Sequence, residues 1–249
     1  MAEHRTRPPS RLFTTQVQRS VLVTPRLMRV TAGGEDLAGF VDTGTDQHVK
    51  LYFYDDPSRL PRPLTLDLAR SLRPRVVPVM RDYTIRRYDA AAAEVDIDVV
   101  LHGQGIAAGW AARAAPGDEL LFVGPAQGYR PDPDVAGHLL VGDETALPAI
   151  AATLESLPSG VTARVVVEIA DDAERQPLPE RFDVDWVLRG ATRLLDVVAG
   201  LTLPTSVHTW IATEGAQTRA IRTHLLADRG VPRRLVHATA YWRRGSAGG

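Results

Sequence analysis

The sequence predicts two folding units, an N-terminal antiparallel β barrel over residues 1–130 and a mostly parallel α/β sandwich domain over residues 131–249. Two observations predict this division. The first half reads as short strands separated by turns, with one helical segment, which is typical of a small barrel. After the segment 129–134, whose prolines and aspartates favour an extended or turning linker, strands and helices alternate. Such alternation is typical of a parallel sheet with helices on both faces.

The expected barrel elements follow from local patterns. In residues 94–101 (EVDIDVVL) apolar residues alternate with two aspartates, the pattern of a half-buried strand. Pro78 places the first part of the segment 75–87 at an edge or a bulge. The first 15 residues contain three arginines and no apolar stretch, so we expect a solvated tail and not a secretory signal. The expected strands are 49–54, 75–87, 94–101 and 118–123, and the expected helix is 104–115.

The second half is expected to alternate regularly. Residues 161–170 form an almost continuous apolar run, which is typical of a buried parallel strand. The expected strands are 138–141, 161–170, 184–188, 207–212 and 235–241, and the expected helices are 146–157, 192–201 and 216–229.

Composition excludes several classes of function. The chain has no cysteine, which excludes disulfides, thiolate metal sites and a cysteine nucleophile. Its 29 basic and 30 acidic residues give a net charge of −1, and no global attraction to nucleic acid or anionic membranes follows. The only lysine is Lys50, so the remaining basic residues are arginines. No apolar run is long enough to span a membrane, and the seven histidines show no metal-binding spacing. We therefore expect a cytoplasmic protein without membrane insertion or a fixed metal.

A polar and aromatic group lies on one predicted barrel strand. Arg81 and Tyr83 are two residues apart and therefore share a strand face, and Thr84 follows them. An arginine fork suits a phosphate, a tyrosine ring suits a flat ligand, and a hydroxyl offers a hydrogen bond. On this motif alone, an ordinary strand with an exposed arginine and a half-buried tyrosine is the favoured explanation.

Residues 81–86, Arg-Asp-Tyr-Thr-Ile-Arg, resemble the R-x-Y-[ST] flavin motif of the ferredoxin-reductase-like superfamily, in its siderophore-interacting (ferric-siderophore reductase) branch. Residues 96–125, 139–158, 210–226 and 241–245 resemble further stretches of the same branch, in the same order. The resemblance implies a flavin-binding barrel, an α/β domain, FAD as the cofactor, and reduction of ferric iron held in a siderophore. The chemistry would be carried by the flavin, so no side chain is expected to be catalytic.

The resemblance also implies roles for residues of the barrel. It places Arg81 on the flavin phosphate, Tyr83 on the isoalloxazine and Thr84 near the reactive ring nitrogen. The loop 102–105 follows a strand and opens a helix, so its backbone N–H groups could receive the pyrophosphate. The resemblance implies cofactor contacts for His102, Gly103, Gly105 and Ala107. The family pattern has a proline where this chain has Ile106, and Trp110 matches a family tryptophan but equally fits a core position.

The loop 142–148 (GDETALP) follows the first strand of the second domain. Thr145 is expected to cap the next helix, with Pro148 at its third position. The resemblance places this loop over the flavin, with Asp143 and Thr145 as contacts. Two adjacent carboxylates, Asp143 and Glu144, argue against an ordinary dinucleotide pyrophosphate site, because like charges repel.

The chain ends in a segment that contains Tyr-Trp-Arg-Arg-Gly. The resemblance places Trp242 near the flavin, and Arg243 and Arg244 could face an anionic ferric chelate or be a solvated basic tail. The electron donor stays open between NAD(P)H and ferredoxin. Two other functions also stay open: a flavin reductase with another acceptor, and a non-catalytic siderophore-binding protein.

Overall fold

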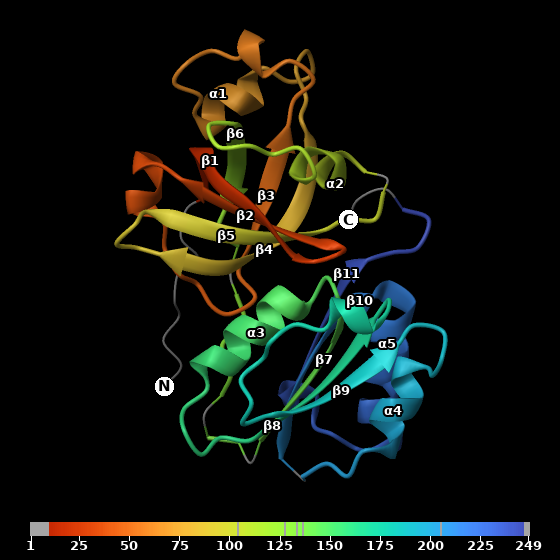
Figure 1. The fold of residues 1–249 in the computed structure, drawn as a ribbon. Helices are drawn as coiled ribbons and strands as arrows, with labels where there is room; N and C mark the ends of the chain where they lie inside the picture. The colour runs from red at the N-terminus through yellow and green to blue at the C-terminus, as the bar shows by residue number, and fades with distance from the viewer. Residues whose placement is uncertain are drawn as a thin grey trace. The chain divides into compact units, whose positions relative to one another are not determined.

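The computed structural model describes residues 10–246 except 104, 127, 133, 136 and 205. The chain divides into two compact units, shown in Figure 1. The first comprises Met1–Leu22 and Met28–Tyr129, and the second comprises Val23–Leu27 and Arg130–Gly249. The short segment Val23–Leu27, which contains the end of one barrel strand and the start of the next, belongs to the second unit.

The first unit is a closed barrel of six strands in the order β1-β2-β5-β4-β3-β6, which confirms the predicted barrel. Strand β6 pairs antiparallel with both β1 and β3, and β4 pairs antiparallel with both β3 and β5. Short helices lie in the connections. The strands are β1 Arg11–Thr24, β2 Leu27–Gly33, β3 His48–Phe53, β4 Val79–Asp89, β5 Glu94–Val100 and β6 Glu119–Gly124, and the helices are α1 Leu66–Ser71 and α2 Ile106–Ala111.

The N-terminal segment is not the solvated tail that the sequence predicts. Strand β1 starts at Arg11, pairs antiparallel with β6, and buries Phe13 and Thr15 to 1% exposure. Residues 1–9 lie outside the described residues. Isolated apolar residues such as Phe13 and Val17 give little local signal, and they become a strand because the barrel closes only when β1 meets β6.

Two other boundaries differ from the prediction. Strand β4 begins at Val79, so Pro78 precedes the strand and causes no bulge in it. Helix α2 covers only Ile106–Ala111, because the chain turns at the Pro116–Gly117 step and the preceding residues are turn or coil. The sequence patterns predict neither strand β2 nor helix α1.

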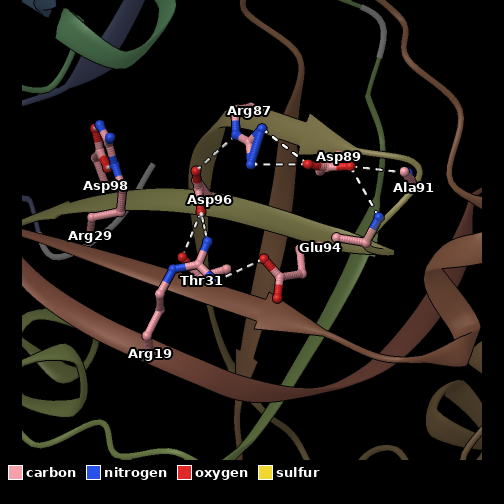
Figure 2. A network of polar contacts seen from close by, with 10 residues as sticks. Arg19, Arg29, Thr31, Arg87, Asp89, Ala91, Glu94, Asp96 and Asp98 are labelled. Atoms are coloured by element: carbon pink, nitrogen blue, oxygen red, sulfur yellow. Dashed lines mark hydrogen bonds and ion pairs between the residues drawn. The ribbon is translucent and has the colours of Figure 1, made fainter.

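The outer face of β5 is more buried than expected. The prediction of a half-buried strand is wrong, since Asp96 is 7% and Asp98 is 4% exposed. Arg29 of β2 donates to both carboxylate oxygens of Asp98 at 2.6 and 2.7 Å, and Thr31 donates to Asp96 at 2.6 Å. Figure 2 shows this network, which further arginines from β1 and β4 extend. Buried carboxylates keep their charge at low cost only when they are paired in this way.

The second unit is a five-stranded parallel sheet in the order β11-β10-β7-β8-β9, which confirms the predicted alternation. Residues of β7 alternate between two covered faces. Gly142 faces Ile150 of α3, whereas Leu139 and Val141 pack with residues of α4 and α5. The elements are β7 Gly137–Asp143, α3 Leu147–Ser156, β8 Ala163–Ile169, β9 Asp183–Leu188, α4 Leu194–Gly200, β10 Val207–Glu214, α5 Gly215–Thr223 and β11 Val236–Trp242.

The strand order reverses between β7 and β10. From β7 the chain adds β8 and β9 on one side, and it then returns to place β10 and β11 on the other side. In open α/β sheets, ligands bind at such a switch point, outside the carboxyl ends of the strands. Asp143 ends β7, Glu214 ends β10 and Trp242 ends β11, so all three lie at this edge.

No helix among the described residues is both long and apolar enough for a membrane span. Within the same residues, no three histidine or acidic side chains are grouped so that they could hold a metal ion.

Candidate functional site

Strand β4 presents Arg81 and Tyr83 on one face. In the antiparallel register with β3, Arg81 lies opposite Leu51 and Tyr83 lies opposite Val49. Residues directly opposite each other share a face, and Leu51 and Val49 are barrel core residues. The predicted shared face of Arg81 and Tyr83 is therefore confirmed. The Arg81 guanidinium donates a hydrogen bond to the Met80 carbonyl at 2.7 Å.

Tyr83 is half-buried against the barrel core. Burial raises the pKa of its phenol to about 12, and the neighbouring Arg81 charge opposes this rise. At neutral pH the phenol is therefore protonated, so the ring is an uncharged, flat surface. Thr84 lies opposite His48 and is turned to the other strand face, where it is 6% exposed.

The loop between β5 and α2 has the backbone form that its glycines allow. Gly103 has φ 74° and Gly105 has φ 127°, both in the region that favours glycine. A Cβ on Gly105 would lie 2.9 Å from Cε1 of His102, whereas a Cβ on Gly103 would meet open space. Ala107 is 4% exposed with its methyl in the barrel core, so only its backbone is available to a ligand.

Trp110 lies on the same helix and packs against the barrel core, with its ring 5.9 Å from that of Phe53. Of the two roles that the sequence left open for Trp110, the structure has the core position. Nothing in its described surroundings requires a ligand.

In the second unit, the predicted residues Asp143, Thr145 and Trp242 lie together at the carboxyl edge of the sheet. Asp143 is 1% exposed. Its Oδ1 accepts from the Thr145 backbone N–H at 2.9 Å and from the Thr145 hydroxyl at 2.5 Å. Its Oδ2 accepts from the Thr213 hydroxyl at 2.9 Å and from Nε1 of Trp242 at 2.8 Å. The sequence alone gives no sign of the role of Thr213.

Thr145 does not cap helix α3 as predicted. The helix begins at Leu147 with Ala146 at the N-cap, and no described side chain caps it. Pro148 is the second residue of the helix, not the third. The reason is that Thr145 is used in a turn closed by the Asp143 carboxylate, and such local side-chain bonds compete with capping.

Glu144, the second acidic residue of this loop, is bound by an arginine that the sequence does not single out. Arg189 donates to Glu144 and, at 2.9 Å, to Glu168 near the end of β8. Gln217 of α5 donates to the other oxygen of Glu168 at 3.3 Å. Burial raises the pKa of Glu144, and the hydrogen bond from Arg189 opposes this rise. A sequence signal for Arg189 does exist. Glu144 and Glu168 lie near the ends of two neighbouring parallel strands, and such a pair of acidic residues indicates that a cation lies between them.

The terminal arginines are exposed. Arg243 lies against Gly215, where its Cγ is 3.3 Å from the position of an added Cβ, and Arg219 approaches the same position to 3.5 Å. The Arg244 backbone N–H donates to Glu214 at 3.3 Å. None of these three arginine side chains forms a salt bridge with a described residue. Residues 215–249 contain seven arginines and one aspartate, so this end of the chain is strongly basic although the whole is near neutral.

Two family models match the chain, one in each unit. The siderophore-interacting FAD-binding domain matches residues 16–129, and the siderophore-interacting protein domain matches residues 135–245. The first match includes β4 with Arg81 and Tyr83, and the second includes the cluster around Asp143.

Similar proteins cover nearly the whole chain. Ferric vibriobactin reductase ViuB of Vibrio cholerae is 33% identical over 91% of this chain and 88% of its own length. The NADPH-dependent ferric-chelate reductase of Escherichia coli is 31% identical over 96% of this chain and 95% of its own. The crystal structure of a siderophore utilization protein from T. fusca has a TM-score of 0.84 and 33% identity, covering 98% of this chain and 97% of that one. The chain therefore belongs to the siderophore-interacting protein family.

Proposed function

We propose that this protein reduces ferric iron held in a siderophore by means of a bound FAD, in the cytoplasm. The observation that carries the proposal is the placement of Arg81 and Tyr83 side by side on one face of β4, within the unit matched by the FAD-binding family. The names of the V. cholerae and E. coli relatives, both ferric reductases, support the same reaction class.

The residues of the first unit fit an FAD. A flavin dinucleotide needs cationic and N–H donors for its pyrophosphate and a flat apolar surface for its ring. Arg81 supplies the cation, and among described partners only one of its terminal nitrogens is engaged. The turn at Gly103 and Gly105 lets backbone N–H groups approach a ligand closely, and Tyr83 supplies the ring surface. We propose that Thr84, His102 and the Ala107 backbone complete the contacts.

When bound, FAD supplies the electron transfer to the iron. The protein binds and orients the two reactants, and no side-chain acid, base or nucleophile is required. Hard oxygen donors of a siderophore hold ferrous iron more weakly than ferric iron, so reduction releases the metal. Because Tyr83 stays uncharged at neutral pH, it adds no negative charge beside an electron-rich ring.

We propose that Arg243 and Arg244 attract the anionic ferric chelate, together with Arg219. Their exposure and the scarcity of acidic residues after Glu214 support this role. Arginine keeps its charge at every physiological pH and binds carboxylate and catecholate oxygens through a planar fork. The flavin contacts that the resemblance implies for Asp143, Thr145 and Trp242 stay predictions.

The test is a flavin spectrum followed by iron release. The purified protein, with FAD added, should show a bound-flavin absorption band, and ferric siderophore with reductant should yield ferrous iron in a ferrous-specific chelator. Arg81→Ala should weaken FAD binding at least tenfold, whereas Lys50→Ala, which removes an outward-facing cation on the neighbouring strand, should not. A protein that stays colourless with added FAD contradicts the proposal.

Two further measurements separate the alternatives. Stopped-flow reduction of the bound flavin by NADH, NADPH and reduced ferredoxin identifies the donor. Arg243→Gln with Arg244→Gln should raise the KM for ferric siderophore and leave kcat unchanged. Tight siderophore binding without any ferrous iron would indicate a non-catalytic carrier, and flavin reduction without iron release would indicate another acceptor.

A further inference from the structure

The Asp143 carboxylate, at the end of β7, is fully used inside the protein. Each of its oxygens accepts two hydrogen bonds, from the Thr145 backbone N–H and hydroxyl, from the Thr213 hydroxyl and from the Trp242 indole N–H. A carboxylate has about four lone-pair sites, and this side chain is 1% exposed, so it offers no acceptor to a ligand. What Asp143 does, it does through the groups that donate to it.

Trp242 is the donor that ties the end of β11 to this carboxylate. The register with β10 shifts after Thr213, so that Tyr241 is an extra residue and Trp242 pairs with the next residue of β10. Such a bulge re-aims the side chain that follows it. The indole of Trp242 thereby reaches Asp143 at 2.8 Å, across the intervening strand β10.

A second acid, Glu214 at the end of β10, holds the chain beyond β11. The Arg244 backbone N–H donates to its Oε1 at 3.3 Å, while its Oε2 accepts from the Ala216 backbone N–H of α5 at 2.5 Å. The Arg243 carbonyl accepts from the Ser246 backbone N–H at 3.1 Å, which closes a turn. The segment 242–246 is thus fastened to β7 through a side chain and to β10 through a backbone group.

This fastening brings Arg243 beside Arg219 of α5. Both approach Gly215, where an added Cβ would lie 3.3 Å from Cγ of Arg243 and 3.5 Å from Nη1 of Arg219. Both side chains are exposed. Since like charges repel, the two arginines stay together only where the backbone under each is fixed. Helix α5 fixes Arg219, whereas Arg243 lies beyond the last strand and depends on the anchors on either side of it.

From this arrangement we infer that Asp143 is a positioning residue: through the Trp242 indole it holds the arginines of the segment 242–246 in place for an anionic ferric chelate. The carboxylate itself needs no contact with the chelate. The inference rests on the proposed function in that the ferric chelate is the anion, and it names the residue that organises the binding surface.

The substitution Asp143→Asn separates positioning from charge, because the two predict opposite signs. An amide keeps the side-chain shape but has one acceptor oxygen and one NH2 group. With its oxygen used by the local Thr145 turn, its NH2 faces the Trp242 N–H, donor against donor, and the indole is released. The variant also removes one negative charge, which by charge alone strengthens anion binding. Positioning predicts weaker binding of the chelate, whereas charge alone predicts tighter binding.

The first measurement is titration of the FAD-loaded protein with the gallium(III) complex of a tris-catechol siderophore, an anionic and redox-inert chelate. In Asp143→Asn and in Trp242→Phe the Kd should rise about fivefold or more, toward that of the variant with Arg243→Gln and Arg244→Gln. Asp143→Asn added to that double variant should change the Kd less than about twofold, because the arginines to be positioned are gone.

Asp185→Asn is the matched control. It removes the same charge from β9, the edge strand opposite β11, where Asp185 pairs with Arg164 at 2.6 Å. Its Kd should not rise. Unchanged or tighter binding in Asp143→Asn overturns the inference. An unaltered protein that does not bind the gallium complex contradicts the proposed function instead, and the second measurement then still decides whether Asp143 positions the segment 242–246.

The second measurement is an NMR spectrum of the indole and backbone N–H signals, which needs no chelate. The chain has four tryptophans, and Trp242→Phe identifies the signal of Trp242. In Asp143→Asn this signal should move upfield and exchange with water about tenfold faster or more, and the Arg244 amide signal should shift with it. Unchanged signals for Trp186 and Trp210 establish that the sheet is folded. An unchanged Trp242 signal overturns the inference.

Discussion

Replacing Arg29 by methionine should destabilise the barrel, because it leaves a buried carboxylate without its partner. The Asp98 side chain is 0% exposed and receives two hydrogen bonds from Arg29, at 2.6 and 2.7 Å. Both residues are labelled in Figure 2. Methionine keeps the apolar stem of the arginine and removes only the guanidinium. Breaking a buried ion pair from one side costs about 3–5 kcal/mol. Since Arg29 is itself 29% exposed, water reaches the pair from one side, and we expect the lower end, about 3 kcal/mol.

Urea unfolding, followed by circular dichroism, measures this loss. At an m value of about 1–3 kcal/mol per molar urea, the midpoint of the barrel transition should fall by about 1–3 M. Arg87→Met is the matched control, since Arg87 is 52% exposed and lies 3.4 Å from Asp96. Because Asp96 keeps its hydrogen bond from Thr31 and the Arg87 side chain is half exposed, we expect this loss to be less than about 1 kcal/mol.

A double variant tests the physical cause. Arg29→Met combined with Asp98→Val removes both charges, and replacing a buried pair by apolar residues is close to neutral. The double variant should therefore recover most of the stability that Arg29→Met loses. The reasoning is refuted if Arg29→Met costs no more than Arg87→Met, or if the double variant is less stable than Arg29→Met.

Four further predictions concern single sites. In an alkaline absorbance titration, the phenol of Tyr83 should ionise only near pH 12, and Tyr83→Phe should remove that step. Burial is the larger cause, and the charge of neighbouring His208 the smaller one, that lowers the pKa of His138 below its unfolded value of about 6.5. Its contribution to stability is thus present above about pH 6.5 and is lost as the pH falls below that value. The urea midpoint should drop between about pH 7.5 and 5.5, and it should drop less in His138→Phe; an equal drop contradicts the assignment. Gly105→Ala should lower the free energy of unfolding by about 1–3 kcal/mol, because φ is 127° there, and should weaken FAD binding. Gly109→Ala, inside helix α2, should instead be stabilising by about 0.5–1 kcal/mol in thermal unfolding, and a loss there would contradict the helix assignment.

Local patterns were sufficient for most strands and for the fold class. The alternation in residues 94–101 and the strand–helix order after residue 134 are short-range signals, and both appear as β5 and as the parallel sheet. The spacing of Arg81 and Tyr83 likewise determines their shared face, because successive side chains of any strand alternate. The absence of cysteine determines that no thiol of this chain takes part in the chemistry.

Contacts between residues far apart in the sequence follow only from the tertiary structure. The start of β1 is a strand because it closes the barrel against β6, which follows much later in the chain. Arg189 pairs with Glu144, and Trp242 bonds to Asp143, only because the parallel sheet brings the ends of β7, β9 and β11 to one edge. A residue's own neighbours in sequence determine which face it occupies, whereas its hydrogen-bond partner depends on which strands become adjacent. This is why the residues of the site were predicted one by one, and why the bond between Asp143 and Trp242 was not.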